Sequence, residues 1–534
     1  MKYIIIMALI ICTHCSDAAV IWPGTTAPCN TTLDACAAGS SVGEVIEIHT
    51  NGPIDESITT NNAISFVAGT GYRPVFAAGR HLEISGTANT NLTVTVSGLT
   101  FLSGRIAYRS FGFNGVTTTL NITDNRIENN TFDNESIRIL HFGSSNATHE
   151  LNLNISANQI NFNTSGVNVD RSGAIAITNG DISNSSSTDL LSGQIFSNQI
   201  NVSGNESVGI GLYEFDENTS DLDVSGNTFT GGEAGAMYVE KDVQSFGDSR
   251  IDFANNAIYR NQVDTVMVGF DSLVSDGSLE ANIINNSVIG ANQGFNFRQA
   301  FGGVYDINFH NNLVAYSGRS VVIRNPTTAD INGNISFSND YNLFYENNLT
   351  DPDFVSGTNH MTANPMLKGM NNARLLPGSP AIEAANQAAL FLIGSVPLID
   401  ADGLYRIKNG NPNAGGFALD VGAYEAGDVR LLDVLKGNAS NLNPIEDNDI
   451  NQQEFAKLQV TQNWHTPNGL GIFNDANIGV WKTPSSWNIF NQDPSTPMDS
   501  GTAYNVWNPA PSTHNFVHTA TDASPNNDAT TALD

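Results

Sequence analysis

Short alternating runs of apolar and polar residues recur along the first two thirds of the chain, and an asparagine follows each run. Two examples are Leu120-Asn121-Ile122-Thr123 and Ile251-Asp252-Phe253-Ala254. An apolar residue at every second position predicts a β-strand with one buried face. The asparagines recur at intervals of 26 to 40 residues, at Asn125, Asn158, Asn198, Asn227, Asn256, Asn286, Asn312 and Asn342. A period near 30 that carries strands predicts a coiled solenoid.

A second series of strands is predicted about 11 to 18 residues after the asparagines, at 137–142, 174–178, 208–215, 236–239, 265–270 and 321–323. Two or three short strands per repeat predict an all-β fold, a right-handed parallel β-helix over residues 19–360. Asparagine tolerates the left-handed backbone of a sharp corner, and its amide can bond to the asparagine of the next coil. We therefore expect a ladder of asparagines along one corner.

The first residues carry the features of a secretory signal peptide over residues 1–18. Lys2 precedes an apolar stretch at 4–12, and small and polar residues end it at Ala18. The apolar stretch is too short to span a bilayer, so we expect a secreted or cell-surface protein without a transmembrane segment in the mature chain. In an exported chain, Cys29 and Cys36 predict a small disulfide loop, with a free thiol pair as the alternative.

The chain is strongly acidic, with a formal net charge of -31. Such a surface repels phosphate backbones, so we expect no nucleic-acid partner. It also repels polyuronates unless a divalent cation such as Ca²⁺ lies between the two. The charge therefore leaves polysaccharides and cell-surface components as the expected partners.

Charged residues recur after the second strand of successive repeats, and their spacing predicts one column along an edge of the solenoid. The members of this column are Arg138, Arg171, Glu214 with Asp216, Glu240 to Asp242, Asp271, Arg298 and Arg324. A polysaccharide lyase would hold Ca²⁺ with Asp216, Glu240 and Asp242, and would use Lys241 or Arg298 as its base. The carboxylates around Lys241 favour its ammonium form, which opposes that role unless a cation offsets them. A glycoside hydrolase would instead use Glu214 and Glu240, since adjacent coils suit the separation of a carboxylate pair. The alternative is a solvated rim that prevents edge aggregation.

Several segments resemble known exported proteins. Ile48-His49-Thr50-Asn51-Gly52-Pro53 and Gly71-Tyr72-Arg73-Pro74-Val75, after the paired cysteines, resemble the opening coils of secreted bacterial right-handed parallel β-helix repeat proteins. Residues 361–430 resemble the choice-of-anchor Q segment, with Glu383 in place of the usual Asp and an insertion at 386–398. The resemblance implies export and a C-terminal cap. Asp400 and Asp402 in this segment are either calcium ligands or members of a turn.

Residues 431–509 are rich in Trp and Asn and resemble an uncharacterised extracellular repeat. Trp464, Trp481 and Trp487 are candidate substrate-binding platforms for sugars, with burial in a small β core as the alternative. The usual opening of this repeat recurs at 516–521, so residues 510–534 are expected to be the truncated start of a second copy or a disordered tail.

These patterns favour an exported, cell-surface-associated β-helix protein that acts in binding or display. The alternative is a calcium-assisted polysaccharide lyase or a glycoside hydrolase acting along a groove of the solenoid.

Overall fold

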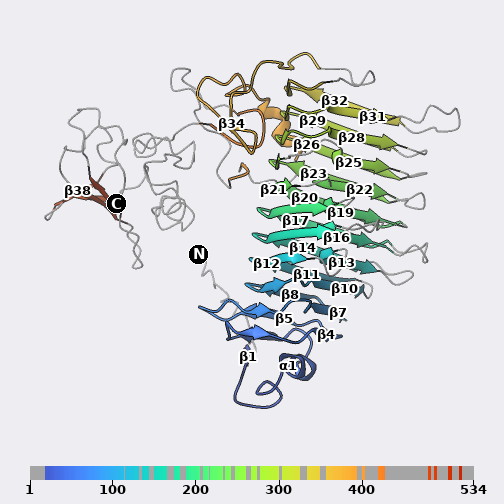
Figure 1. Cartoon of the computed structure of the whole chain (residues 1–534), viewed down its shortest axis with the longest axis vertical. Coiled ribbons are helices and arrows are strands. Elements are labelled where there is room, and N and C mark those ends of the chain that lie inside the picture. The colour runs from blue at the N-terminus through green and yellow to red at the C-terminus, as the bar shows by residue number, and fades with distance from the viewer. Residues whose placement is uncertain are drawn as a thin grey trace, which may run out of the picture. The chain divides into compact units, whose positions relative to one another are not determined.

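The structure is a computed structural model that describes residues 19–426, apart from short segments, and four strands between 479 and 519 (Figure 1). The segments outside the described residues are 89, 113–114, 131–134, 143–148, 165–172, 181–187, 205–207, 216, 232–234, 242–246, 260–265, 273–276, 300–303, 325–333, 349–356, 394–399 and 403–418. The structure is 57% strand and 3% helix, and the predicted all-β parallel β-helix is confirmed.

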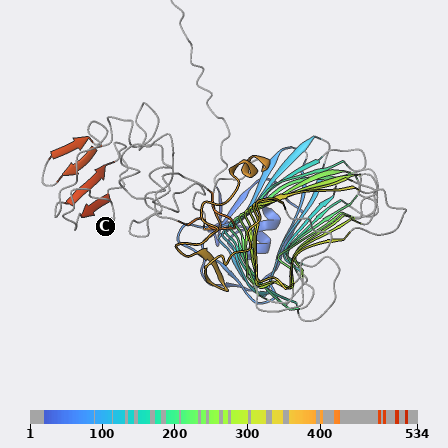
Figure 2. The ribbon, with the colours of Figure 1, turned by 90° about the horizontal axis from the view of Figure 1, so that it is seen from above.

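Three long parallel sheets make up the β-helix, and each coil contributes one strand to each sheet (Figure 2). Sheet A contains, in order, β1 (Val20–Trp22), β2 (Val45–Ile48), β5 (Ser65–Ala68), β8 (Leu92–Ser97), β11 (Val116–Thr123), β14 (His149–Ser156), β17 (Leu190–Phe196), β20 (Thr219–Ser225), β23 (Asp248–Ala254), β26 (Ser278–Ile284), β29 (Val304–His310) and β32 (Asn334–Asp340).

Sheet B contains β3 (Pro53–Ile54), β6 (Val75–Phe76), β9 (Thr100–Leu102), β12 (Arg126–Asn130), β15 (Gln159–Thr164), β18 (Gln199–Gly204), β21 (Thr228–Gly231), β24 (Ala257–Tyr259), β27 (Ser287–Ile289), β30 (Leu313–Ala315) and β33 (Leu343–Tyr345). Sheet C contains β4 (Ile58–Thr60), β7 (Leu82–Ala88), β10 (Ile106–Gly112), β13 (Glu135–Phe142), β16 (Gly173–Asn179), β19 (Val208–Glu214), β22 (Met237–Lys241), β25 (Val266–Ser272), β28 (Gln293–Gln299) and β31 (Arg319–Arg324).

Strand pairing places like residues over one another. In β11 and β14, Leu120 pairs with Leu153 and Ile122 with Ile155, and all four side chains are buried. The coils of β11 and β14 are thus held together by backbone hydrogen bonds between the strands and by stacked aliphatic side chains inside the β-helix. By its internal contacts the chain divides into two compact units. Unit 1 comprises 1–194, 198–221 and 240–247, and unit 2 comprises 195–197, 222–239 and 248–534.

The expected asparagine ladder is present within each unit. In unit 1, Asn125 Nδ2 donates to Asn158 Oδ1 at 3.1 Å, and Asn158 Nδ2 donates to Asn198 Oδ1 at 2.9 Å. The ladder in unit 2 runs from Asn227 through Asn256, Asn286 and Asn312 to Asn342. These side chains are buried, so their amides satisfy each other rather than water.

The ladder asparagines do not themselves adopt the left-handed backbone, so that part of the expectation is wrong. The residue before each one does, with φ between 55° and 61°, at Asp124, Ala157, Ser197, Gly226, Asn255, Asn285, Asn311 and Tyr341. At each corner, the asparagine and the residue before it therefore have different roles. One residue turns the chain, and the next bonds the coils together.

A short helix that the sequence patterns did not predict follows β1. Helix α1 (Leu33–Gly39) begins after Thr32, whose side chain accepts a bond from the Ala35 backbone. The Glu56 carboxylate accepts bonds from the first two helical N–H groups, at 2.7 and 3.1 Å. These contacts satisfy donors that a helix leaves without partners at its start. The predicted Cys29–Cys36 disulfide is confirmed and ties the helix to the preceding turn.

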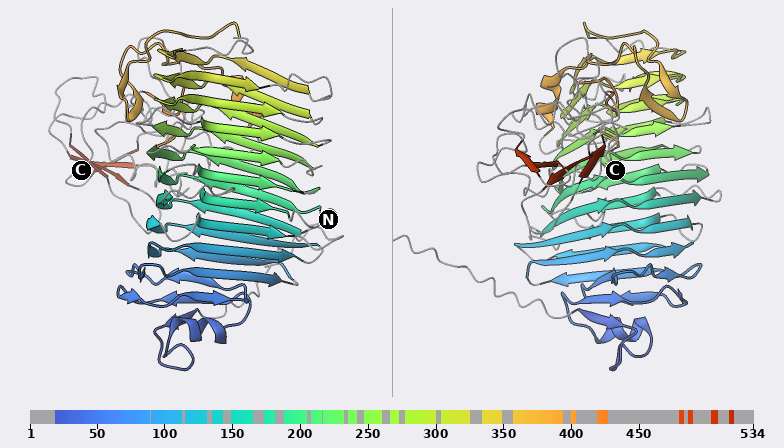
Figure 3. Two further views of the ribbon diagram at one scale, coloured as in Figure 1. Left: turned by 45° about the vertical axis from the view of Figure 1, so that its right-hand side comes forward. Right: turned by 90° about the vertical axis from the view of Figure 1, so that its left-hand side faces the viewer.

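In unit 2, the described residues between 357 and 426 pack against the side of the β-helix (Figure 3). We call them the lateral segment. The segment includes β34 (Leu367–Gly369), β35 (Asn372–Leu375) and the 3₁₀ helix η1 (Gln387–Leu392). Its apolar side chains share one buried cluster with residues of β24, β27, β30 and β33. It thus covers the outer face of sheet B over four coils, not only the last coil that a terminal cap would cover. The insertion contributes Ala389 and Ile393, which pack on Ala254 and Ile284 of sheet A.

The last four strands form a separate antiparallel sheet. Its order is β37 (Ser486–Ile489), β36 (Gly479–Lys482), β38 (Ala503–Trp507) and β39 (Phe516–Thr519). Strand β39 falls within the predicted start of a second repeat, and it pairs with β38. Within the described residues no helix is long and apolar enough to cross a membrane.

Candidate functional site

The predicted column of charged residues is not a single column. In unit 2, Asp271, Arg298 and Arg324 do occupy one register position, although their side chains lie outside the described residues. In unit 1, Arg138 pairs with Ala176, and Ala176 pairs with Gly211 of β19. Glu214 lies three residues after Gly211 in that strand, so it belongs to another column. The repeats differ in loop length, so equal distances along the sequence do not give equal positions in the sheet.

Glu214 and Lys241 are the predicted carboxylate and base, and both lie inside the β-helix. Neither side chain has any exposed surface, and Lys241 Nζ lies 3.1 Å from Glu214 Oε2. Lys241 Nζ also donates to the Gly247 carbonyl at 2.8 Å. A polymer on the outside of the solenoid cannot reach either group, so the prediction that they face a groove is wrong.

The remaining members of the predicted site do not complete it. Glu240 precedes the buried Lys241 in β22 and is half-buried, so strand alternation turns it toward the outer face. Glu214 and Glu240 therefore lie on opposite faces of sheet C and cannot flank one glycosidic bond, as a hydrolase requires. The predicted ligands Asp216 and Asp242 lie outside the described residues. Among the described residues, no three His, Cys, Asp or Glu side chains gather in a way that would hold a metal ion.

Glu214 instead ends a buried polar column in unit 1. Ser110, His141, Asn179 and Glu214 occupy the same register position in β10, β13, β16 and β19. His141 Nδ1 lies 3.0 Å from Asn179 Oδ1, and its Nε2 lies 3.0 Å from Nδ1 of His149 in β14. Each buried polar atom in these pairs has a polar neighbour in place of water.

Burial sets the charge of the two imidazoles. Desolvation and the neighbouring imidazole of His149 lower the pKa of His141 to about 3, and desolvation lowers the pKa of His149 to about 4. Both rings are neutral at physiological pH. The column is therefore a buried network that links neighbouring strands of unit 1. It presents no charged imidazole at the surface.

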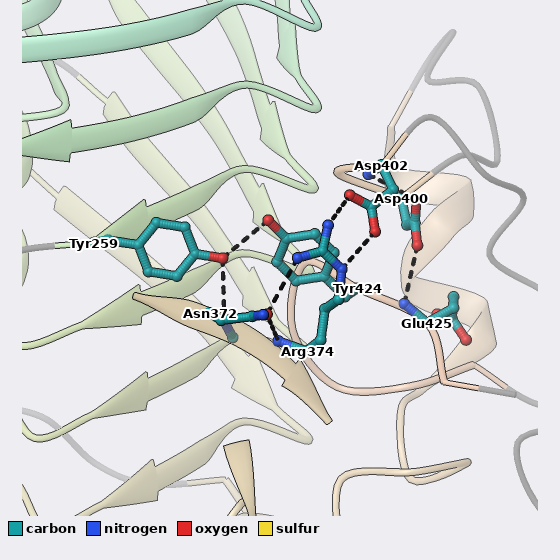
Figure 4. A network of polar contacts seen from close by, with 8 residues as sticks. Tyr259, Asn372, Arg374, Asp400, Asp402, Tyr424 and Glu425 are labelled. Carbon is teal, nitrogen blue, oxygen red and sulfur yellow. Dashed lines mark hydrogen bonds and ion pairs between the residues drawn. The ribbon is translucent and has the colours of Figure 1, made fainter. Parts of the chain in front are cut away.

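The predicted calcium turn is part of a polar network that holds the lateral segment of unit 2 (Figure 4). Asp400 is buried, and its carboxylate accepts bonds from the backbone N–H groups of Asp402 and Glu425, at 2.9 and 3.2 Å. The Asp402 carboxylate accepts two bonds from Arg374, whose guanidinium stacks over the Tyr424 ring at 4.6 Å. These carboxylates bond to backbone and arginine donors, which is the arrangement of a turn.

The network also joins this segment to the β-helix. Tyr259 of β24 donates its hydroxyl proton to Tyr424 Oη at 2.9 Å, and it accepts a bond from the Ala373 backbone. Gly422 has φ +103°, and a Cβ there would lie 2.7 Å from Ser287 Oγ. Only glycine permits this close approach to β27.

The tryptophans fall in the separate antiparallel sheet. Trp481 pairs with Trp487, and Trp507 pairs with Gly479, two residues before Trp481. The side chains of these tryptophans lie outside the described residues, and so does all of Trp464.

The outer face of sheet A in unit 1 carries a regular group of uncharged polar side chains that the sequence analysis did not single out. Three outward positions on each of β8, β11 and β14 pair in register, and these neighbouring strands are labelled in Figure 1. We call the nine residues the sheet A array: Thr93, Thr95, Ser97, Thr119, Asn121, Thr123, Asn152, Asn154 and Ser156. Thr93 is exposed, Ser156 is buried, and the other seven are half-buried.

Hydrogen bonds between coils hold the array in place. Asn154 Nδ2 donates to Asn121 Oδ1 at 3.2 Å, and Asn121 Nδ2 donates to Thr95 Oγ1 at 3.3 Å. In the next column, Thr123 Oγ1 donates to Ser97 Oγ at 3.0 Å. The hydroxyl and amide groups are thus oriented before any ligand arrives. The sequence signal for these residues was the polar half of the alternating runs.

Comparison with known proteins informs only the C-terminal part of the chain. Residues 433–507 match the model of a domain of unknown function, DUF7452. This match falls within the predicted Trp- and Asn-rich repeat. No protein with a curated description matches the chain.

Proposed function

We propose that the protein is exported and acts at the cell surface in binding or display, without catalysis. The observation that carries this proposal is the buried ion pair of Glu214 and Lys241, both with 0% exposed surface. Glu214 is one of the two carboxylates that the predicted hydrolase needs at a groove, and Lys241 is one of the two bases named for the predicted lyase. On the outer face of sheet A, unit 1 presents the oriented, uncharged polar groups of the sheet A array.

The organisation of the chain also supports binding or display. A parallel β-helix positions residues rigidly along its outer faces, because paired strands bond neighbouring coils and asparagine ladders bond the coils at 125–198 and at 227–342. The apolar stretch at the N-terminus supports export, and the expected partners are polysaccharides or cell-surface components. The separate antiparallel sheet, of which β36, β37 and β38 lie within 433–507, adds a second module on which an interaction can be built.

A parallel assay of binding and cleavage tests the proposal. The purified chain is incubated with neutral and acidic polysaccharides and with intact cells, with and without Ca²⁺. Retention is measured by sedimentation, and cleavage by new reducing ends and by the ultraviolet absorbance of unsaturated uronates. We expect retention without cleavage. Cleavage that is lost in Glu240→Gln, in a protein that still unfolds cooperatively, would support the lyase or hydrolase instead.

A further inference from the structure

The sheet A array of unit 1 has three properties that together restrict its ligand. Its nine side chains carry hydroxyl or amide groups, and none carries a charge or an aromatic ring. They repeat along two directions, at about 4.8 Å between coils and about 6.6 Å between alternate residues of a strand. Their mutual hydrogen bonds limit the rotamer freedom that binding would otherwise remove.

We infer that the sheet A array binds a neutral polysaccharide. A chain of uncharged sugars offers a regular row of hydroxyl groups that donate and accept hydrogen bonds, as the threonine and asparagine side chains do. The array has no Trp, Tyr or Arg of the kind that anchors protein interfaces, so a protein partner fits it less well. The inference rests on the proposed binding function and names its ligand class.

Charge distinguishes neutral from acidic polymers at this face. The chain carries a net charge of -31, which repels uronates and phosphates at long range. The array itself is neutral. Beside it, Glu150 accepts a hydrogen bond from the Thr117 hydroxyl at 3.0 Å and keeps its negative charge, whereas Asp124 pairs with Arg73 at 2.6 Å. A neutral polymer carries no charge for Glu150 to repel, so it can approach the array where an acidic polymer would be repelled.

The outer face of sheet A in unit 2 differs in this respect. Arg250, Glu280 and Asp306 occupy one register position on β23, β26 and β29, and Arg250 also pairs with Asp252 at 2.8 Å. Charged residues thus replace the uncharged ladder. We assign the neutral ligand to unit 1 alone.

The test compares substitutions on two outer faces of unit 1. Thr95→Ala, Thr119→Ala and Thr123→Ala, combined in one variant, remove three hydroxyls from the array and keep the strands. The control combines Asn161→Ala, Asn201→Ala and Ser203→Ala, which remove polar groups from the outer face of sheet B. Both variants must keep the wild-type circular dichroism spectrum and melting midpoint.

The probes are insoluble cellulose, chitin, mannan and β-1,3-glucan, with alginate and polygalacturonate as acidic polymers. We expect sedimentation with at least one neutral polymer, at least tenfold weaker binding in the sheet A variant, and less than a twofold change in the control. Equal binding by the sheet A variant would overturn the inference, as would binding to acidic polymers only.

Intact cells separate this inference from the broader proposal. If the protein binds cells, and neither neutral polysaccharides nor the sheet A substitutions reduce that binding, the inference fails and the binding function stands. Binding to neither cells nor any polymer would contradict both. Loss of cell binding in the sheet A variant, with competition by a neutral polymer, would support both.

Discussion

Substitution of one ladder asparagine tests how the coils are held together. The side chain of Asn158 makes four hydrogen bonds: it accepts from Asn125 N and Nδ2, at 3.0 and 3.1 Å, and donates to Ile122 O and Asn198 Oδ1, at 2.8 and 2.9 Å. Asn158→Ala leaves two donors of Asn125 without partners at a site where Asn125 is 1% exposed. A buried unsatisfied donor costs about 1–3 kcal/mol, so we expect a loss of about 4 kcal/mol.

The matched control lies three residues further along the same coil. Asn161 is exposed, and its side chain accepts one long bond, at 3.4 Å, from Asn201. We expect Asn161→Ala to change the free energy of unfolding by less than about 0.5 kcal/mol.

Urea unfolding and hydrogen exchange measure the two variants. Coils interact mainly with their neighbours, so the lost protection in Asn158→Ala should concentrate in peptides covering 116–164. The reasoning is refuted if Asn158→Ala destabilises by less than about 1 kcal/mol, or by no more than Asn161→Ala.

Three further predictions follow from buried groups. Acidification from pH 6.5 toward pH 3 should lower the melting midpoint less in His141→Gln than in the wild type, since the unfolded chain binds protons that the buried imidazole, with its lowered pKa, does not. Lys241→Met should destabilise by about 3–5 kcal/mol in urea unfolding, because Glu214 loses its cation in a site without exposed surface. Gly422→Ala should detach the lateral segment and speed its limited proteolysis, because the new Cβ meets Ser287.

Each of these predictions has an outcome that would contradict it. An identical response to acid from His141→Gln and the wild type would contradict the first prediction. Combining Lys241→Met with Glu214→Gln should recover part of the lost stability, whereas an additive loss would argue against the buried pair. Gly378→Ala shares the positive φ, at +86°, without a neighbour within 4 Å. It should leave proteolysis of the segment nearly unchanged, and equal cleavage of both variants would count against the Gly422 contact.

The coil architecture was predictable because its signals are local and repeated. Alternation located the strands, and the recurring asparagines located the corner. The sheet positions of individual charged residues were less accessible, since loops of unequal length shift the register by several residues. Arg138 illustrates this, because it lies three positions away from the column that contains Glu214.

The alternation of inward and outward positions along each strand does predict that Glu214 and Lys241 point inward. Ile210 and Leu212 precede Glu214 at alternate positions, and Met237 and Val239 precede Lys241 in the same way. In both strands the polar residue continues the buried face. The lateral packing of residues 357–426 had no comparable signal, because it depends on contacts between segments more than a hundred residues apart, such as Tyr259 with Tyr424.

Protection of the sheet A array from chemical labelling tests the binding account most directly. Thr119→Cys places a thiol in the array, and Asn161→Cys places one on the outer face of sheet B, while Cys29 and Cys36 are joined in a disulfide. Saturation with the neutral polysaccharide that sediments the protein should slow maleimide labelling of Thr119→Cys at least tenfold and leave Asn161→Cys unchanged. Equal labelling rates of Thr119→Cys with and without the polysaccharide would contradict the account.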